Sequence, residues 1–93
     1  MPFYLRVHEE HWLRDKQEEG RIIVLEDDSV WQVHPADRHA TARWLRISTI
    51  IVKDTEKRKE QYPYLLTNTT EGERARASYL GESMPQTLIS EVA

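Results

Sequence analysis

The chain contains no cysteine among its 93 residues. This absence excludes disulfide bonds and thiolate chemistry, and it is typical of proteins in a reducing cytosol. Long apolar runs are also missing, because the longest span about four residues and roughly 20 are needed to cross a bilayer. The first residues do not have the basic and apolar regions of a secretion signal. We therefore expect a cytoplasmic protein that does not associate with membranes.

Glycine is scarce, with three residues spread along the chain, which excludes a glycine-rich phosphate-binding loop. Ser83 lies in Gly81-Glu-Ser-Met-Pro85, which lacks the second glycine of a nucleophile elbow. The adjacent acids Glu9-Glu10, Glu18-Glu19 and Asp27-Asp28 have no apolar surroundings that would raise a pKa, so they indicate solvated surface. The sequence therefore predicts no enzyme activity and no cofactor.

The size and charge of the chain predict one small domain without an overall attraction to polyanions. A chain of 93 residues forms one domain, and its net charge of −3 creates no field that favours nucleic acid. We expect the domain to span residues 1–85 and residues 86–93 to form a flexible tail after Pro85.

The most informative stretch begins at Gly20 and predicts an antiparallel hairpin. Arg-Ile-Ile-Val-Leu is followed by the acidic turn Glu26-Asp-Asp-Ser29 and then by Val30-Trp-Gln-Val33. The turn has no glycine, but aspartate tolerates a left-handed backbone and can bond to it. Trp31 and Val33 share one face of the second strand. We expect Trp31 to be a central core residue, because one such ring buries roughly 150 to 250 Å².

Further β-rich segments follow the hairpin, and they alternate with polar turns. Arg46–Lys53, Tyr62–Thr67 and Arg74–Leu80 are predicted strands, whereas Asp54–Gln61 has no apolar residue and is a predicted loop. Asp37–Trp44 is predicted to form one or two helical turns between the second and third strands.

The start of the chain is ambiguous. Phe3, Leu5 and Val7 alternate as in a strand, and His8–Glu19 is rich in helix formers with Gly20 just past its end. The predicted fold class is therefore mainly β with minor α: a small, partly open antiparallel barrel of four to five strands, with an N-terminal helix and a short helical insertion.

The hairpin from Gly20 to Val33, together with Pro35-Ala-Asp, Trp44 and Tyr62-Pro-Tyr-Leu-Leu-Thr-Asn68, resembles a group of small uncharacterised bacterial proteins. The resemblance covers about residues 20–80. It implies a Src-homology-3-like barrel and no particular function. The chain departs from the pattern at Asp28, where the group usually has glycine.

Small open barrels bind partners at strand edges and in aromatic grooves, so the favoured function is a non-catalytic protein-interaction or adaptor module. Edge pairing between two copies would equally give a homodimer. The rings expected to remain partly exposed for a partner lie beside charge or proline: Tyr4, Trp12, Tyr62 and Tyr64.

A weak single-stranded nucleic-acid binder is the first alternative, because positive charge next to aromatic rings is typical of such proteins. Acidic neighbours offset part of this charge, and the competing interpretation is that Trp44 and at least one tyrosine are core residues. The residues that would contribute are Lys57, Arg58, Lys59, Tyr62, Tyr64, Arg43 and Arg46.

A histidine metal site is the second alternative. If His8-Glu-Glu-His11 is helical, its two histidines lie three residues apart on one face, and His34 and His39 would complete the site. The order differs from the His-Glu-x-x-His of metalloproteases, and an exposed polar helix face is the simpler interpretation.

Overall fold

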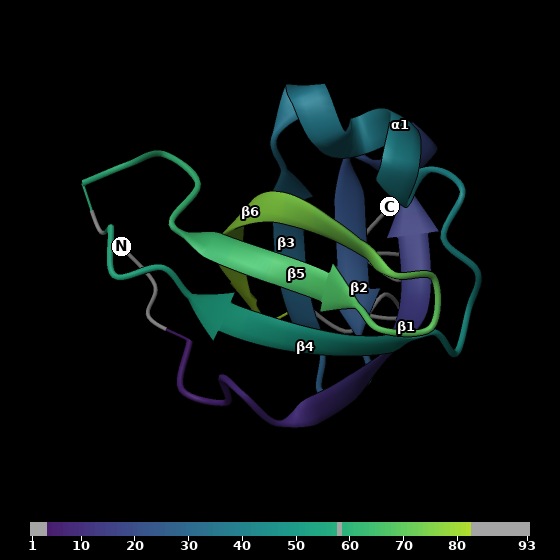
Figure 1. Cartoon of the computed structure of the whole chain (residues 1–93), viewed down its shortest axis with the longest axis horizontal. Helices are drawn as coiled ribbons and strands as arrows, with labels where there is room; N and C mark the ends of the chain where they lie inside the picture. The colour runs from purple at the N-terminus through teal and green to yellow at the C-terminus, as the bar shows by residue number, and fades with distance from the viewer. Residues whose placement is uncertain (1–3, 58, 83–93) are drawn as a thin grey trace, which may run out of the picture.

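A computed structural model of the chain describes residues 4–57 and 59–82 and shows a small antiparallel β-barrel (Figure 1). The strands close in the order β1-β2-β3-β6-β5-β4, and every neighbouring pair is antiparallel. Their bounds are β1 Glu10–Gln17, β2 Ile22–Leu25, β3 Ser29–Val33, β4 Thr49–Asp54, β5 Tyr64–Asn68 and β6 Glu73–Glu82.

The barrel has six strands and is closed, so the expected partly open barrel of four to five strands is wrong in both details. Closure depends on β1, which pairs with β2 along one part of its length and with β4 along the other. Trp12 lies opposite Thr49 in the second of these pairings. Within the described residues this closure leaves no edge strand, so the predicted partner binding by edge pairing loses its structural basis.

The predicted N-terminal helix is wrong, because the residues from Glu10 to Gln17 form β1. Their helix propensity amounts to a few tenths of a kcal/mol per residue. Pairing with strands on both sides and burial of His11 and Leu13 outweigh this preference. The strand expected around Leu5 and Val7 is not formed in the described residues, where the chain before β1 is irregular.

Three short helical segments cover one end of the barrel, and the predicted helical insertion between the second and third predicted strands is confirmed. The 3₁₀ turn η1 joins β1 to β2, whereas η2 and α1 follow β3 and appear above the strands in Figure 1. Their bounds are η1 Glu18–Gly20, η2 Pro35–Asp37 and α1 Arg38–Thr41. No helix in the described part of the chain is long and apolar enough to cross a membrane.

The predicted hairpin is confirmed as β2 and β3, with Ile23 opposite Trp31. Asp28 occupies the turn with a φ of 70°, and its backbone N–H donates to the Leu25 carbonyl at 3.0 Å. This is the left-handed conformation that aspartate tolerates, which explains how the turn closes without glycine. A bulge between Val30 and Trp31 shifts the register of β3 against β6.

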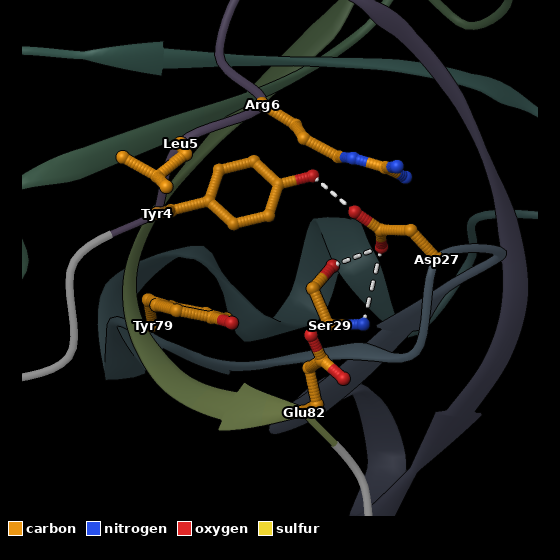
Figure 2. Close-up of a pocket in the computed structure, with 7 residues that line it drawn as sticks. All are labelled: Tyr4, Leu5, Arg6, Asp27, Ser29, Tyr79 and Glu82. Atoms are coloured by element: carbon orange, nitrogen blue, oxygen red, sulfur yellow. Dashed lines mark hydrogen bonds between the residues drawn. The ribbon is translucent and has the colours of Figure 1, made fainter.

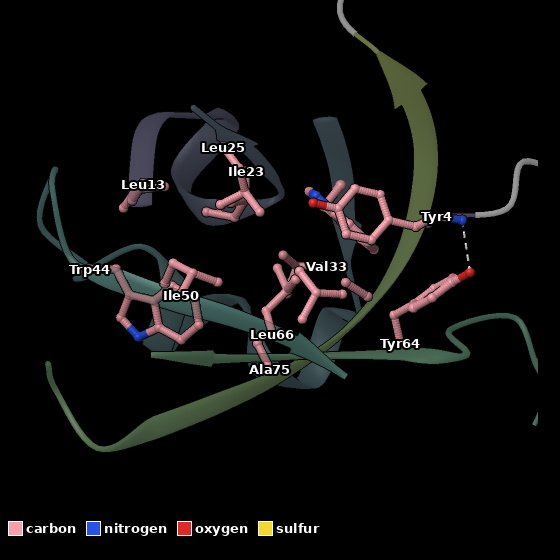
Figure 3. Close-up of a cluster of buried hydrophobic side chains, with 13 residues drawn as sticks. Tyr4, Leu13, Ile23, Leu25, Val33, Trp44, Ile50, Tyr64, Leu66 and Ala75 are labelled. Carbon is pink, nitrogen blue, oxygen red and sulfur yellow. Dashed lines mark hydrogen bonds between the residues drawn. The ribbon is translucent and has the colours of Figure 1, made fainter. Parts of the chain in front are cut away.

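The core fills the barrel and contains two fully buried indole rings (Figure 3). Trp31 is fully buried, as the sequence predicts, and Val33 on the same face is buried beside it in the cluster. Trp44 lies on the side of the cluster away from Tyr4 (Figure 3), and its indole N–H donates to Glu73 Oε1 at 2.9 Å. A buried indole N–H requires such a partner, so Glu73 allows a large ring to sit at this end of the core.

Candidate functional site

A chain of hydrogen bonds joins five almost fully buried side chains. His11 points inward from β1, whereas Ser29 and Trp31 share the inner face of β3. Trp31 Nε1 donates to Ser29 Oγ at 2.9 Å, and Ser29 Oγ donates to Asp27 Oδ1 at 2.6 Å. The Tyr4 hydroxyl donates to Asp27 Oδ2 at 2.5 Å and lies 2.9 Å from His11 Nε2. Asp27, in the β2–β3 turn, therefore connects the two halves of the network.

Both ring nitrogens of His11 face oxygen acceptors. Nε2 lies 3.0 Å from the Arg6 carbonyl and 2.9 Å from the Tyr4 hydroxyl, whose proton is already donated to Asp27. Nδ1 lies 3.0 Å from Glu26 Oε2. Neutral imidazole carries one N–H, so the geometry favours the doubly protonated ring. Burial lowers the pKa of His11, but the Arg6 carbonyl and the Glu26 carboxylate outweigh burial and raise the pKa above its ordinary value.

The two buried oxygen acids of the network are held in opposite protonation states. Burial raises the pKa of Asp27, yet hydrogen bonds from Ser29 and Tyr4 outweigh burial and bring it below its ordinary value. Burial, followed by the hydrogen bond to Asp27 and its negative charge, raises the pKa of the Tyr4 hydroxyl. Asp27 is therefore a carboxylate and Tyr4 a neutral donor near pH 7.

Glu26 links this network to the backbone of β1. Its Oε1 accepts from the backbone N–H of Trp12 at 2.9 Å, and its own backbone N–H donates to the Trp12 carbonyl at 3.1 Å. The side chain remains 23% exposed, whereas that of His11 is 2% exposed. Glu26 is thus the member of the cluster that solvent reaches most easily.

A cavity of about 350 Å³ lies against the network (Figure 2). Tyr4, Asp27 and Ser29 contribute the hydrogen-bonded wall. The Arg6 side chain extends toward Asp27, and Glu82 at the end of β6 lies on the far side of Ser29 in Figure 2. The complete lining is Tyr4, Leu5, Arg6, Asp27, Ser29, Tyr79 and Glu82.

A separate apolar surface lies outside the barrel beside β1, and we call it the Trp12 surface. It consists of Trp12, Leu45 and Ile47, whose exposed fractions are 44%, 66% and 74%. The segment from Leu45 is fastened to β1 because Ile47 N–H donates to the Leu13 carbonyl at 2.9 Å and Leu13 N–H donates to the Ser48 carbonyl at 3.0 Å. These two hydrogen bonds place Ile47 and Ser48 opposite Leu13, the residue that follows Trp12, whereas Trp12 itself lies opposite Thr49.

Ile47 combines two unfavourable features. It is exposed and has a φ of 71°, in the left-handed region that a β-branched side chain rarely occupies. The left-handed conformation costs roughly 1 to 2 kcal/mol for a residue with a Cβ. Strained backbone of this kind is concentrated at functional sites, where the conformation presents a side chain to a ligand or partner.

The four rings predicted to bind a partner have different environments. Tyr4 and Tyr64 are each 4% exposed, so the expectation that they remain exposed is wrong. Their rings form edge contacts with Trp31, at centroid distances of 4.8 Å and 5.3 Å, and burial of apolar ring area outweighs the proximity of charge in sequence. Tyr62 is half-buried against His34, and Trp12 is exposed as expected.

The residues predicted to bind nucleic acid are divided between the two ends of β5. Lys57 and Lys59 lie in the loop that precedes Tyr64, and Arg58 lies outside the described residues. Arg43 binds Glu73, which pairs with Asn68 at the opposite end of β5, and Arg46 lies 3.5 Å from Asp15. The buried ring of Tyr64 offers no stacking face. The structure therefore does not gather the described members of this set into one patch.

The predicted metal ligands are also dispersed. Without an N-terminal helix, the spacing argument for His8 and His11 fails, because His8 lies in an irregular segment outside the barrel wall. His34 Nδ1 accepts from the Ala36 backbone N–H at 3.0 Å, and His39 is exposed on α1. In the described part of the chain, the group of three metal-ligating side chains that the fold assembles is His11, Glu26 and Asp27.

Sequence reasoning missed Glu26, Asp27, Ser29 and Tyr79 as site residues and assigned Asp27 to the solvated surface. One signal was present: Ser29 and Trp31 alternate onto the core face of β3, so a polar residue enters the core directly after the acidic turn. A buried polar group requires a partner, and the acidic turn directly before Ser29 offers Asp27 and Asp28.

Comparison with other proteins adds no assignment to these sites. The chain matches no protein-family model, and no curated protein or solved structure is detectably similar to it. The closed six-stranded barrel is compatible with small-barrel folds of the Src-homology-3-like or oligonucleotide-binding type.

Proposed function

We propose that the chain is a non-catalytic binding module that attaches another protein through the Trp12 surface. The observation that carries this proposal is Ile47, an exposed β-branched side chain at a left-handed φ beside two further exposed apolar residues. The backbone N–H of Ile47 bonds to the Leu13 carbonyl, but folding alone gains nothing from the isoleucine side chain, since it remains in water at a strained φ. A partner that covers Ile47 would recover the buried area.

The composition of the Trp12 surface matches the centre of protein interfaces. Tryptophan, tyrosine and arginine are enriched among the residues whose truncation weakens binding most, and a polar rim surrounds the interface centre. Glu10 and Arg14 flank Trp12 on the same side of β1, and Arg46 stands between Leu45 and Ile47 in sequence. The partner we propose therefore has an apolar centre bordered by charges of both signs. That the barrel belongs to a Src-homology-3-like group and that the protein is cytoplasmic are parts of the same proposal.

The test is affinity capture with the immobilised chain from a lysate of the source cells, with the captured proteins quantified by mass spectrometry. Trp12→Ala and Ile47→Asn are the surface variants, and Leu80→Ala on β6 is the matched control, because its side chain is 47% exposed. We expect one protein whose recovery falls at least tenfold with both surface variants and not with the control. A tenfold loss corresponds to about 1.4 kcal/mol.

Three other outcomes contradict the proposal or redirect it. Recovery of every captured protein to the same extent by all four forms would show that the Trp12 surface is not the interface. Loss of the captured material on nuclease treatment would favour nucleic acid, the first alternative. Sedimentation at two concentrations tests whether the partner is a second copy of the chain. If it is, wild type would dimerise and Ile47→Asn would not.

A further inference from the structure

We propose that His11, Glu26 and Asp27 form a binding site for a divalent transition-metal ion of the Zn²⁺ type. The site is independent of the Trp12 surface, and it differs from the four-histidine set that the sequence suggests. Its ligand atoms come from β1 and from the β2–β3 turn, two segments that pairing of β1 with β2 brings together.

The spacing of the three ligand atoms suits one ion. His11 Nδ1 lies 3.0 Å from Glu26 Oε2 and 3.8 Å from Asp27 Oδ2, and each of the three residues offers one ligand atom within 4.8 Å of those of the other two. Zinc binds histidine nitrogen and carboxylate oxygen at about 2.0 to 2.2 Å. Two such ligands at tetrahedral or octahedral angles are therefore about 3 to 3.5 Å apart. The first distance fits as it stands, the second requires a movement of a few tenths of an ångström, and the separation between the Glu26 and Asp27 oxygens must close from at most 4.8 Å.

Each ligand is already held by a partner outside the set. The other ring nitrogen of His11 donates to the Arg6 carbonyl at 3.0 Å. Glu26 Oε1 accepts from Trp12 N–H at 2.9 Å, which leaves Oε2 for the ion. Metal-bound histidines almost always donate their second N–H to a carbonyl or carboxylate, and ligating carboxylates are hydrogen-bonded in turn.

Asp27 is fixed in the same manner. Ser29 donates to Oδ1 from its hydroxyl at 2.6 Å and from its backbone N–H at 3.1 Å, and Tyr4 donates to Oδ2 at 2.5 Å. A carboxylate oxygen has two lone pairs, so Oδ2 can accept from Tyr4 and bind an ion at the same time. The orientation of all three ligands is thus set before an ion arrives.

The charges also favour a divalent ion. The set contains two carboxylates, and the side chains of His11 and Asp27 are almost fully buried. A divalent ion bound to the neutral ring of His11 balances the charge of the two carboxylates. Balancing buried charge lowers the free energy of the folded state. Nitrogen and carboxylate ligands together suit zinc and its neighbours better than magnesium or calcium, which prefer oxygen alone.

The ion has a route to the site. Glu26 is 23% exposed at the side chain, and Asp27 also lines the 350 Å³ cavity in Figure 2. Three protein ligands leave at least one coordination position, which water from the cavity can fill.

The experiment is isothermal titration of the metal-free full chain with ZnCl₂, combined with ¹⁵N detection of the histidine rings. We expect one ion per chain and a change in the Nδ1 signal of His11. Glu26→Gln, which keeps the shape of the side chain, should weaken zinc binding at least tenfold, as should His11→Asn. His39→Asn on α1 is the matched control and should bind zinc as wild type does.

Three results would overturn the metal site. The first two are no saturable zinc binding by wild type, and equal affinity in Glu26→Gln and wild type. The third is a change of ring signals at His8, His34 or His39 in place of His11. If His11→Asn is unfolded by circular dichroism, Glu26→Gln decides alone, because its substituted group is partly exposed. If wild type binds zinc but captures no protein through the Trp12 surface, the metal site is supported and the proposed function is rejected. The two proposals can therefore fail separately.

Discussion

Gly20 and Thr41 meet so closely that no side chain fits between them. The Thr41 hydroxyl donates to the Gly20 carbonyl at 2.7 Å, and a Cβ added to Gly20 would lie 2.6 Å from that hydroxyl oxygen and 2.5 Å from the backbone nitrogen of Ala42. Gly20 also has a φ of 91°. This contact packs α1 against the turn between β1 and β2.

We predict that Gly20→Ala destabilises the fold by about 3 kcal/mol, the sum of left-handed strain and a clash with backbone that cannot move aside. Gly72→Ala is the matched control. Gly72 has a φ of 72° with open space around it, so only the strain of about 1 kcal/mol applies. Urea unfolding of both variants measures the difference, and equal losses would contradict the close contact.

Trp31→Ala should cost about 3 to 5 kcal/mol, because the ring is fully buried and contacts Tyr4, Tyr64 and Tyr79. The substitution also removes the indole donor to Ser29 Oγ. Trp12→Ala removes the same side chain from the surface and should cost less than about 1 kcal/mol. Thermal unfolding of the two variants compares them directly. A Trp31→Ala variant as stable as Trp12→Ala would refute the assigned core.

Ile47→Asn should stabilise the isolated chain by about 1 kcal/mol while it weakens partner binding. Asparagine tolerates a positive φ, so the substitution relieves strain at a position that is 74% exposed. Leu45→Asn is the control, because Leu45 is exposed without a positive φ. Chemical denaturation should show a gain for the first variant only. Loss of stability in Ile47→Asn would mean that the isoleucine contributes to folding.

The Asp37–Arg76 pair should contribute to acid sensitivity. Arg76 Nε and backbone N–H both donate to Asp37 Oδ2 at 2.9 Å, and the hydrogen bonds from the Arg76 side chain lower the pKa of Asp37 below its ordinary value of 3.8. A lowered folded-state pKa means that the stabilisation is present above the unfolded-state value and is lost as the pH falls through the folded-state value. The affected window therefore lies below about pH 4.

Asp37→Asn tests this linkage, because asparagine keeps the shape and does not titrate. We expect the variant to be about 1 kcal/mol less stable than wild type at pH 7 and to approach wild type near pH 2. Urea unfolding at a series of pH values measures both curves. Parallel curves across this range would show that Asp37 does not contribute to acid unfolding.

The part of the fold that was predictable is local in sequence. The hairpin of β2 and β3 has its own turn chemistry at Asp28, and the alternation of Trp31 and Val33 marks the buried face without reference to other strands. The helical insertion before Trp44 was also predictable, because its sequence signals lie within a few residues. The proposed sites were harder to predict from the sequence, since only Trp12 and His11 among the predicted residues belong to them.

The failures share one cause, which is dependence on distant pairing. The residues of β1 have the propensities of a helix, and they form a strand because β2 and β4 supply backbone partners on both sides. Tyr4 and Tyr64 lie beside proline or charge in sequence, yet the Tyr4 backbone N–H donates to the Tyr64 hydroxyl at 3.0 Å across 60 residues. No local pattern reports such a contact.

The sequence by itself determined a mainly β domain, a hairpin closed by aspartate and a core built on Trp31, because each depends on alternation and turn chemistry within a few residues. Only the tertiary structure decided the closure of the barrel, the exposure of Ile47 at a strained φ and the gathering of His11, Glu26 and Asp27. These three features arise where β1 meets other segments. The strand β1 is stabilised by pairing and burial against those segments, which the sequence of β1 alone does not reveal.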